Sequence, residues 1–263
     1  MPVILKTRRE IEVMRRAGEV AGRVLQVMKE AAGVGVTTGD LDELARRELE
    51  AAGAKSLSKN YQQQNSPWPY PRYTCVSVNE EVVHGVPGTR KLKEGDIATL
   101  DVAMSLDGFC VDTAITVPIG PVSTRVQKLL DVTQQALDLA LMHTLPGKRW
   151  SEIARLVQHF VESHGFNVIR EFVGHGIGRS MHEDPKVPNF VTGEMLRGDF
   201  RLRSGMTLAI EPMVVMGGRD VVLLEDQWTV VTQDRLPAAH FEHTVAVVDG
   251  GVEILTRQPA AAA

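Results

Sequence analysis

Apolar residues recur every three or four positions over the first stretch of the chain, from about residue 7 to residue 32. This spacing places them on one face of an amphipathic helix. A second helix is predicted to start at Thr37 or Thr38, either of which can cap it, and to run through residue 52. Two further helices are predicted over 124–143 and 151–163.

Short apolar runs bounded by turn residues predict strands along the rest of the chain. Two of these runs, 97–106 and 109–119, are separated only by Asp107-Gly108. This dipeptide is typical of a two-residue type I′ hairpin turn, so the two runs are predicted to pair antiparallel. Strands are also predicted near 74–78, 168–173, 207–215, 220–224, 228–232, 240–248 and 252–255.

The order of the predicted elements repeats along the chain. Leu41, Leu44, Leu49 and Gly53 match Ile153, Leu156, Val161 and Gly165 at one constant spacing. Later, the segment from Gly95 to Asp101 parallels the segment from Gly205 to Glu211, and each ends in an acid. These matches predict a single catalytic domain over 1–258, built of related halves at about 7–120 and 121–256, with the site between them. Residues 259–263 are predicted to form a disordered tail.

Composition limits the class and the location of the protein. The 263 residues are 43% hydrophobic and 24% charged, as in ordinary soluble domains, and the net charge of −4 gives no sign of DNA or membrane binding. No stretch approaches the roughly 20 apolar residues that span a bilayer. Two cysteines, Cys75 and Cys110, are too few for a disulfide framework. We therefore expect a cytoplasmic protein with no DNA or membrane partner.

Four carboxylates, Asp101, Asp112, Glu211 and Glu242, lie in or beside the apolar runs that are predicted to be strands. Burying a carboxylate among apolar residues costs free energy unless a cation or another partner compensates. Two divalent cations would balance the charge of four carboxylates. An exposed hairpin edge would explain the two aspartates alone, but the apolar strands around them favour a buried site.

The predicted hairpin brings the two aspartates together. A type I′ turn at Asp107-Gly108 places Ala103 opposite Asp112 and puts Asp101 diagonal to Asp112 on the same face. This diagonal is about 7–8 Å between Cα atoms, a distance that two carboxylates can bridge through a metal ion.

Three histidines lie in surroundings typical of a functional site. His175 lies within a glycine-rich segment, residues 174–178, that permits tight turns and close approach of a ligand. His182 follows soon after it, and His84 precedes Gly-Val-Pro. A locally hydrogen-bonded imidazole would explain each of them alone. Four others, His143, His159, His164 and His240, lack such surroundings and are expected to be structural.

One imidazole with several carboxylates fits Mn, Fe, Co or Zn, and these ligand types do not select among them. The sequence contains neither a Gly-x-Ser-x-Gly elbow nor a His-Glu-x-x-His helix. It therefore predicts a hydrolase with two divalent metal ions. The predicted ligands are Asp101, Asp112, His175, Glu211 and Glu242.

Short motifs from about Thr7 to Thr256 resemble those of type I methionine aminopeptidases in order and spacing. The motifs are His84-Gly85-Val86-Pro87, Asp101 and Asp112 around Asp107-Gly108-Phe109, Gly174-His175-Gly176-Ile177-Gly178, His182, Ile210-Glu211-Pro212-Met213 and Glu242-His243-Thr244. The resemblance implies the pita-bread fold, an α/β architecture of two pseudo-symmetric halves with an antiparallel sheet and outer helices. It also implies removal of the initiator methionine from new polypeptides by hydroxide attack at a dinuclear metal site.

The resemblance implies a role for each metal ligand. Asp112 and Glu242 would bridge the two metals. Asp101 would bind one of them, and His175 and Glu211 would bind the other.

The resemblance also implies roles beside the metals. Glu211 would move protons, His182 would stabilise the developing charge of the scissile carbonyl, and His84 would contact the scissile amide. The substrate pocket would be lined by Tyr70, Cys75, Met181, Met213 and Trp228. Two positions depart from the family pattern, since Met181 replaces the usual Phe and the Pro-rich segment 61–71 replaces a Gly-Tyr-rich one.

Peptides and nascent chains with an N-terminal Met are the implied partners, together with a transient ribosome contact and a monomeric state. Two alternatives stay open. One is a proline-directed aminopeptidase or dipeptidase of the same fold, although such enzymes usually carry an additional N-terminal domain. The other is a non-catalytic pita-bread binding protein, although such proteins typically lose metal ligands.

Overall fold

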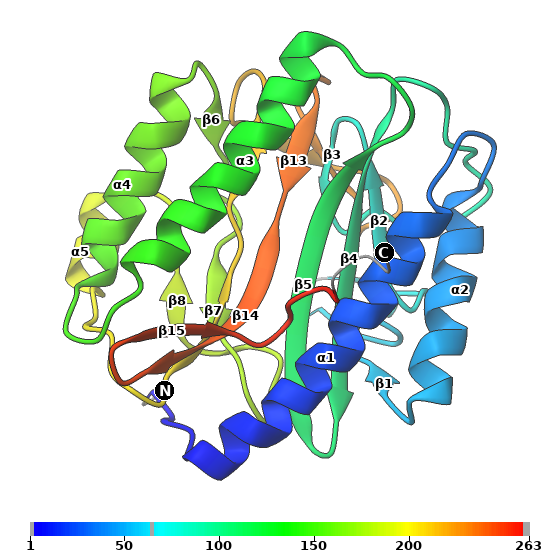
Figure 1. The fold of residues 1–263 in the computed structure, drawn as a ribbon. Coiled ribbons are helices and arrows are strands. Elements are labelled where there is room, and N and C mark those ends of the chain that lie inside the picture. Colours follow the sequence, from blue (N-terminus) through cyan, green and yellow to red (C-terminus); the bar gives the residue numbers. More distant parts are fainter. Residues whose placement is uncertain (1–2, 64–65, 260–263) are drawn as a thin grey trace.

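Four long helices lie on one side of an antiparallel sheet in the computed structural model, which describes residues 3–63 and 66–259 (Figure 1). Helices α1 (Arg8–Ala31) and α2 (Thr38–Ala51) cover the part of the sheet that belongs to the first half of the chain. Helices α3 (Thr124–His143) and α4 (Trp150–Ser163) cover the part that belongs to the second half. Apart from Pro259, the predicted tail lies outside the described residues.

Side-chain caps explain where the first two helices begin. The Thr7 hydroxyl accepts a hydrogen bond from the backbone N–H of Glu10, and the Glu10 carboxylate accepts one from the backbone N–H of Thr7. Thr37 and Asp40 form the same reciprocal pair at the start of α2. These capping boxes satisfy N–H groups that have no partner within the helix. The predicted helices are confirmed to within one or two residues.

The main sheet has nine strands in the order β1-β4-β5-β14-β9-β7-β8, with β2 paired to β4 and β15 paired to β14. Its strands are β1 (Lys55–Ser56), β2 (Cys75–Val78), β4 (Ile97–Leu106), β5 (Phe109–Pro118), β7 (Gly174–Gly176), β8 (Glu183–Val187), β9 (Thr207–Ile210), β14 (Glu242–Val248) and β15 (Gly251–Ile254). Two three-stranded sheets complete the fold. One joins β13 (Ala238–His240), β10 (Met213–Val215) and β6 (Asn167–Val168), and the other joins β11 (Val221–Leu223), β12 (Val230–Thr232) and β3 (Glu81–Val83).

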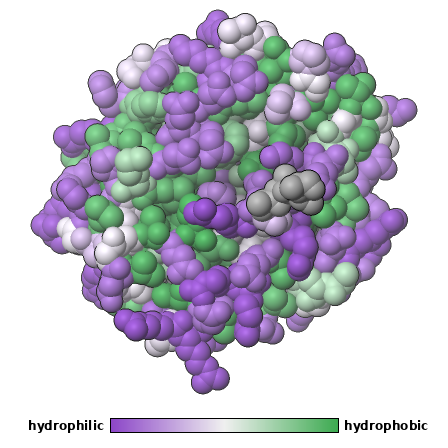
Figure 2. Space-filling view, in the orientation of Figure 1, coloured by the Kyte–Doolittle hydropathy of each residue, from purple (hydrophilic) through white to green (hydrophobic). Residues whose placement is uncertain are grey.

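The apolar core lies between the helices and the sheet. Trp150, at the start of α4, is fully buried there, and its indole N–H donates to the carbonyl of Pro188 at 2.7 Å. The outer surface of the helices is mixed, since Figure 2 shows hydrophobic residues divided by hydrophilic ones. Among the described residues, none of the helices has the length and apolar character that crossing a membrane requires.

The β4–β5 hairpin has the predicted geometry. Asp107 and Gly108 have φ angles of 50° and 77°, and a type I′ turn requires positive values at both positions. Ala103 is paired with Asp112, as predicted. The hairpin therefore carries both aspartates in the expected register.

Three predicted strands are wrong in their extent. The run at 168–173 is strand only at Val168, and the next strand begins at Gly174. The run at 207–215 breaks after Ile210 because Pro212 lacks the N–H that a continuous ladder needs. The run at 240–248 breaks at Phe241, and the short elements β1, β3, β7, β8 and α5 (Gly193–Arg197) were not predicted.

The two halves meet where β5 pairs with β14, a junction that we call the seam. Backbone pairing at the seam is recorded at two positions, and threonine hydroxyls add to it. The Thr113 hydroxyl donates to the carbonyl of Glu242 at 2.9 Å. The Thr244 hydroxyl accepts from the N–H of Asp112 and donates to its carbonyl, both at 2.8 Å. The seam therefore fixes the register between the two halves.

Candidate metal centre

Strand register places three of the four carboxylates on one face of the main sheet. Asp101 and Glu242 are both paired with Ala114, which lies on the strand between them. Asp112 precedes Ala114 by two residues and therefore points to the same side. Carboxylates from β4, β5 and β14 thus converge across the seam.

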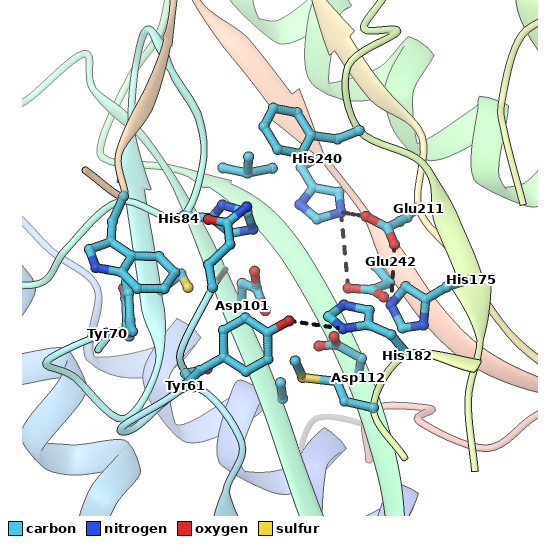
Figure 3. Close-up of a pocket in the computed structure, with 18 of the residues that line it drawn as sticks. Tyr61, Tyr70, His84, Asp101, Asp112, His175, His182, Glu211, His240 and Glu242 are labelled. Carbon is cyan, nitrogen blue, oxygen red and sulfur yellow. Dashed lines mark hydrogen bonds and ion pairs between the residues drawn. The ribbon is translucent and has the colours of Figure 1, made fainter. Parts of the chain in front are cut away.

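The second half adds Glu211 and His175 to this face. Glu211 directly follows β9, and β9 is paired with β14 up to His243, so Glu211 lies beside Glu242. His175 is paired with Ala209, two residues before Glu211, and so faces the same side. The Nε2 atom of His175 lies 3.7 Å from Oε1 of Glu211. Figure 3 shows the side chains of both halves pointing toward one another.

Glycines on either side of His175 let β7 lie close to its neighbours. A Cβ atom at Gly174 would lie 2.4 Å from the carbonyl oxygen of Ala209, and one at Gly176 would lie 2.3 Å from that of Asp184. The glycines thus serve close strand packing. The Nδ1 atom of His175 lies 2.9 Å from the carbonyl oxygen of Gly176, which can only accept, so Nδ1 carries the proton. Nε2 is then free to bind a metal ion.

The ligand atoms fit a divalent cation. One atom each of Asp112, His175 and Glu242 lies within 4.8 Å of the other two. Oε1 of Glu242 is buried and has no hydrogen-bond partner among the described residues. A buried carboxylate oxygen without a partner indicates that a ligand belongs there.

Crowding of the carboxylates favours their protonated forms when no metal is bound. Burial raises the pKa of Asp112 to about 7. Burial, and then repulsion from Asp112, raises the pKa of Asp101, Glu211 and Glu242 well above the usual values. Divalent cations would offset both effects by stabilising the charged carboxylates, so the chemistry of this donor set fits the metals that the sequence predicts.

His84 and His182 reach the cavity from the two halves. His84 has a φ angle of 59°, a left-handed conformation that is uncommon for any residue but glycine and is concentrated at functional sites. Burial lowers the pKa of His84 to about 4, and burial also lowers the pKa of His182. Nδ1 of His182 lies 3.3 Å from the Tyr61 hydroxyl, and the ring centroids of His182 and His175 are 4.5 Å apart.

A cavity of about 240 Å³ opens beside these groups. Four of the predicted pocket residues, Tyr70, Cys75, Met181 and Trp228, line it. The rings of Tyr70 and Trp228 meet edge to face at 5.2 Å, and burial raises the pKa of the Cys75 thiol well above its usual value. Met213 is not among the lining residues, because it packs into the apolar cluster behind the cavity with Val82.

His240 and Tyr61 line the cavity as well, although neither was predicted to be a site residue. Nε2 of His240 lies 3.7 Å from Oε2 of Glu211 and 4.0 Å from Oε2 of Glu242. The alternation of strand residues was the signal for His240, since it precedes Glu242 by two positions. The other histidines expected to be structural, His143, His159 and His164, lie on or at the end of α3 and α4, away from the cavity.

The fold and this donor set define a class of protein, and sequence comparison names it. Residues 12–249 match metallopeptidase family M24, and the chain belongs to that family. Methionine aminopeptidase 1 of Bacillus subtilis is 44% identical over 255 residues, covering 97% of this chain and 99% of that protein. The methionine aminopeptidase of Aquifex aeolicus is 43% identical, with 97% and 99% covered.

Solved structures agree with this assignment. The crystal structure of a Thermotoga maritima methionine aminopeptidase matches with a TM-score of 0.90 and 42% identity, covering 97% of this chain and all of that one. A Pyrococcus furiosus prolidase matches with a TM-score of 0.77 but 19% identity, covering 98% of this chain and 66% of that one, and therefore shows the shared fold alone. The pita-bread fold and the resemblance to methionine aminopeptidases are confirmed.

Proposed function

We propose that this protein is a methionyl aminopeptidase that removes the initiator methionine from nascent proteins and peptides. The observation that carries the proposal is one small cavity with two unlike ends. Acidic side chains and His175 gather at one end, and Tyr70, Cys75 and Trp228 form a soft apolar wall at the other. A cavity of this size suits one terminal side chain held beside a metal-dependent reaction.

The metal ligands that we propose are Asp101, Asp112, His175, Glu211 and Glu242. Asp112 and Glu242 lie centrally and would contact both ions, while Asp101 lies on the side of the first half and His175 on the side of the second. When bound, two divalent ions would supply a water deprotonated near neutral pH and would polarise the scissile carbonyl. Their identity, among Mn, Fe, Co and Zn, is left to experiment.

Side chains around the ligands would handle protons and charge. Glu211 lies beside the proposed metal-bound water and would accept its proton and deliver it to the departing amine. His182 would donate a hydrogen bond to the developing oxyanion, and the Tyr61 hydroxyl would orient its ring. His84, on the other side of the cavity, would contact the scissile amide.

The apolar wall would select the methionine side chain. A thioether is polarisable and packs favourably against aromatic rings and other sulfur groups. Trp228 and Tyr70 line the cavity with rings that meet edge to face, and Cys75 and Met181 add sulfur. Because Met181 is flexible, we expect broad tolerance of the residue that follows the terminal methionine.

We further propose a single catalytic domain of two related halves that acts as a monomer in the cytoplasm. Each half packs a helix pair on its part of the sheet, as α1 with α2 and α3 with α4. Contact with the ribosome would be transient and would bring the enzyme to nascent chains.

Hydrolysis of Met-Ala-Ser, Leu-Ala-Ser and Ala-Pro-Ala by chelator-stripped protein tests the proposal, with each divalent metal added back in turn. We expect metal-restored cleavage of Met-Ala-Ser alone. Cleavage of Ala-Pro-Ala alone would assign the protein to the proline-directed enzymes. Folded protein that cleaves none of the peptides with any metal would support the non-catalytic alternative.

A further inference from the structure

His240 ends strand β13 at the edge of the metal centre. It is paired with Met213 of β10, and β10 begins two residues after Glu211. It also precedes Glu242 by two positions. The histidine therefore lies where the chain leaves the two glutamates of the second half, and Figure 3 shows its ring turned toward both.

The backbone of His240 is held from both sides by one hydroxyl. Oγ1 of Thr116 accepts from the N–H of His240 and donates to its carbonyl, each at 2.8 Å. Since Thr116 uses its only proton in this way, the Thr99 hydroxyl, also 2.8 Å away, is the donor to Thr116. The backbone of His240 is thus fixed to β5, and this holds the imidazole ring beside the site.

The ring of His240 has no hydrogen-bond partner among the described residues at either nitrogen, although it is only 2% exposed. A buried imidazole without a partner is costly, and such groups are usually satisfied by a ligand or an ion. The nearest carboxylate oxygens, at 3.7 Å and 4.0 Å, are too distant for hydrogen bonds. A partner for Nε2 therefore belongs between His240 and the glutamates.

The separations match those between two ligands of one ion. Ligand atoms about 2.1 Å from a shared metal lie roughly 3–4 Å apart at the usual coordination angles. His175 Nε2 lies 3.7 Å from Oε1 of Glu211, and His240 Nε2 lies the same 3.7 Å from Oε2. Glu211 therefore has an imidazole at each oxygen, and both imidazoles stand at a ligand-to-ligand distance.

We propose that His240 is a sixth protein ligand of the metal centre and binds a divalent transition metal through Nε2, beside Glu211 and Glu242. The inference rests on the proposed metal centre and does not depend on the peptide substrate. A second imidazole makes the centre richer in nitrogen than the five predicted ligands would. It therefore favours Co, Fe or Zn over the hard cations Mg and Ca.

Calorimetric titration of chelator-stripped protein with Co²⁺ and with Mn²⁺ tests this role in wild type, His240→Ala and His240→Gln. We expect both variants to bind one of the two ions at least about tenfold more weakly, as loss of a metal-supporting residue commonly does. The visible absorption of the Co²⁺ protein should change at the same time. His143→Gln, on α3, is the matched control and should bind both ions as wild type does.

X-ray absorption of the wild-type Co²⁺ protein gives a test that needs no variant. Two imidazoles per pair of ions are expected, and one imidazole would overturn the proposal. Unchanged affinities and an unchanged Co²⁺ spectrum in both variants, with thermal unfolding of the metal-free proteins like that of wild type, would overturn it too. Because none of these measurements uses a peptide, failure of this inference is distinct from failure to cleave Met-Ala-Ser.

Discussion

The two halves of the molecule deliver their carboxylates in different ways. Asp101 and Asp112 lie inside β4 and β5, two unbroken strands of ten residues joined by a tight hairpin. Glu211 and Glu242 lie at breaks, where β9 gives way to β10 and β13 gives way to β14. Pairing along the first hairpin fixes its aspartates completely. At the breaks, the chain can turn more than one side chain into the same space.

The breaks explain why the second half supplies more of the proposed metal ligands. Around Phe241, the chain presents both His240 and Glu242 to the cavity. The first half presents one carboxylate from each strand of its hairpin. The regularly paired strands thus place few polar side chains at the cavity, but place them precisely. The interrupted strands bring more polar side chains to it.

Removing a ligand from the regular half should have the largest effect. We expect Asp112→Asn to lower kcat/KM on Met-Ala-Ser by at least about 10³-fold, because a central ligand of the metal-dependent reaction is lost. Asp107→Asn, at the exposed tip of the same hairpin, is the control and should remain within about twofold of wild type. An Asp112→Asn protein with normal metal content and normal turnover would contradict the assignment.

The pH dependence of stability isolates the same aspartate without metal. Burial raises the pKa of Asp112 to about 7, above the usual 3.8, so the folded state keeps a proton that the unfolded state releases. Stability from this group is therefore present below about pH 4 and is lost as the pH rises to about 7. The Asp112→Asn protein lacks this titration, so its free energy of unfolding should rise relative to that of wild type by a few kcal/mol (~2–4) across this pH window.

Urea unfolding in chelator at several pH values between 4 and 7 would measure this difference. The buried histidines have lowered pKa values and stabilise the folded state as the pH rises. Because both proteins contain them, this opposite effect cancels when the free energy of unfolding of one protein is subtracted from that of the other. A difference in unfolding free energy that stays constant with pH would show that Asp112 titrates normally.

His84 and His182 line the cavity without being proposed metal ligands, and they allow a direct comparison across it. We expect His84→Asn, in the first half, and His182→Asn, in the second, each to lower kcat by about 10²-fold, as loss of one oxyanion donor does. Asparagine tolerates the left-handed backbone at residue 84. Metal affinity measured by calorimetry should stay unchanged, and a tenfold loss would mean that the residue binds metal. His159→Asn, exposed on α4, is the control.

The smallest effect is expected from a substitution at Gly176, where β7 lies close to β8. A methyl group at Gly176 would meet the carbonyl oxygen of Asp184, so Gly176→Ala should lower the free energy of unfolding by about 1–3 kcal/mol. Gly193→Ala, on α5, has open space around the new Cβ and should change stability little. Denaturant titration compares the two, and equal stabilities would show that β7 can move away from β8 without cost.

The strands and site residues of the first half, with its unbroken hairpin, are also easier to predict from the sequence than those of the second half. Asp107-Gly108 specifies a turn type, the turn specifies a register, and the register places Asp101 beside Asp112 before any contact is known. No comparable local signal marks the second half, where 240–248 forms a continuous apolar pattern and the break at Phe241 depends on tertiary packing. His240 was assigned a structural role, although its place two residues before Glu242 indicates through strand alternation that both face the same side. Met213 is apolar and near Glu211 in sequence, but the turn at Pro212 directs it into the core.

The seam between β5 and β14 has a consequence for the newly made chain. Asp101 and Asp112 lie on one side of it, and Glu242 lies on the other. A chain whose halves have not yet joined therefore holds an incomplete set of the proposed ligands, and a slip of one residue along the seam would turn Glu242 to the opposite face. The proposed ligands come together only when β5 and β14 pair in this register. A partly folded chain is therefore expected to be inactive, and the appearance of activity would mark the completion of folding.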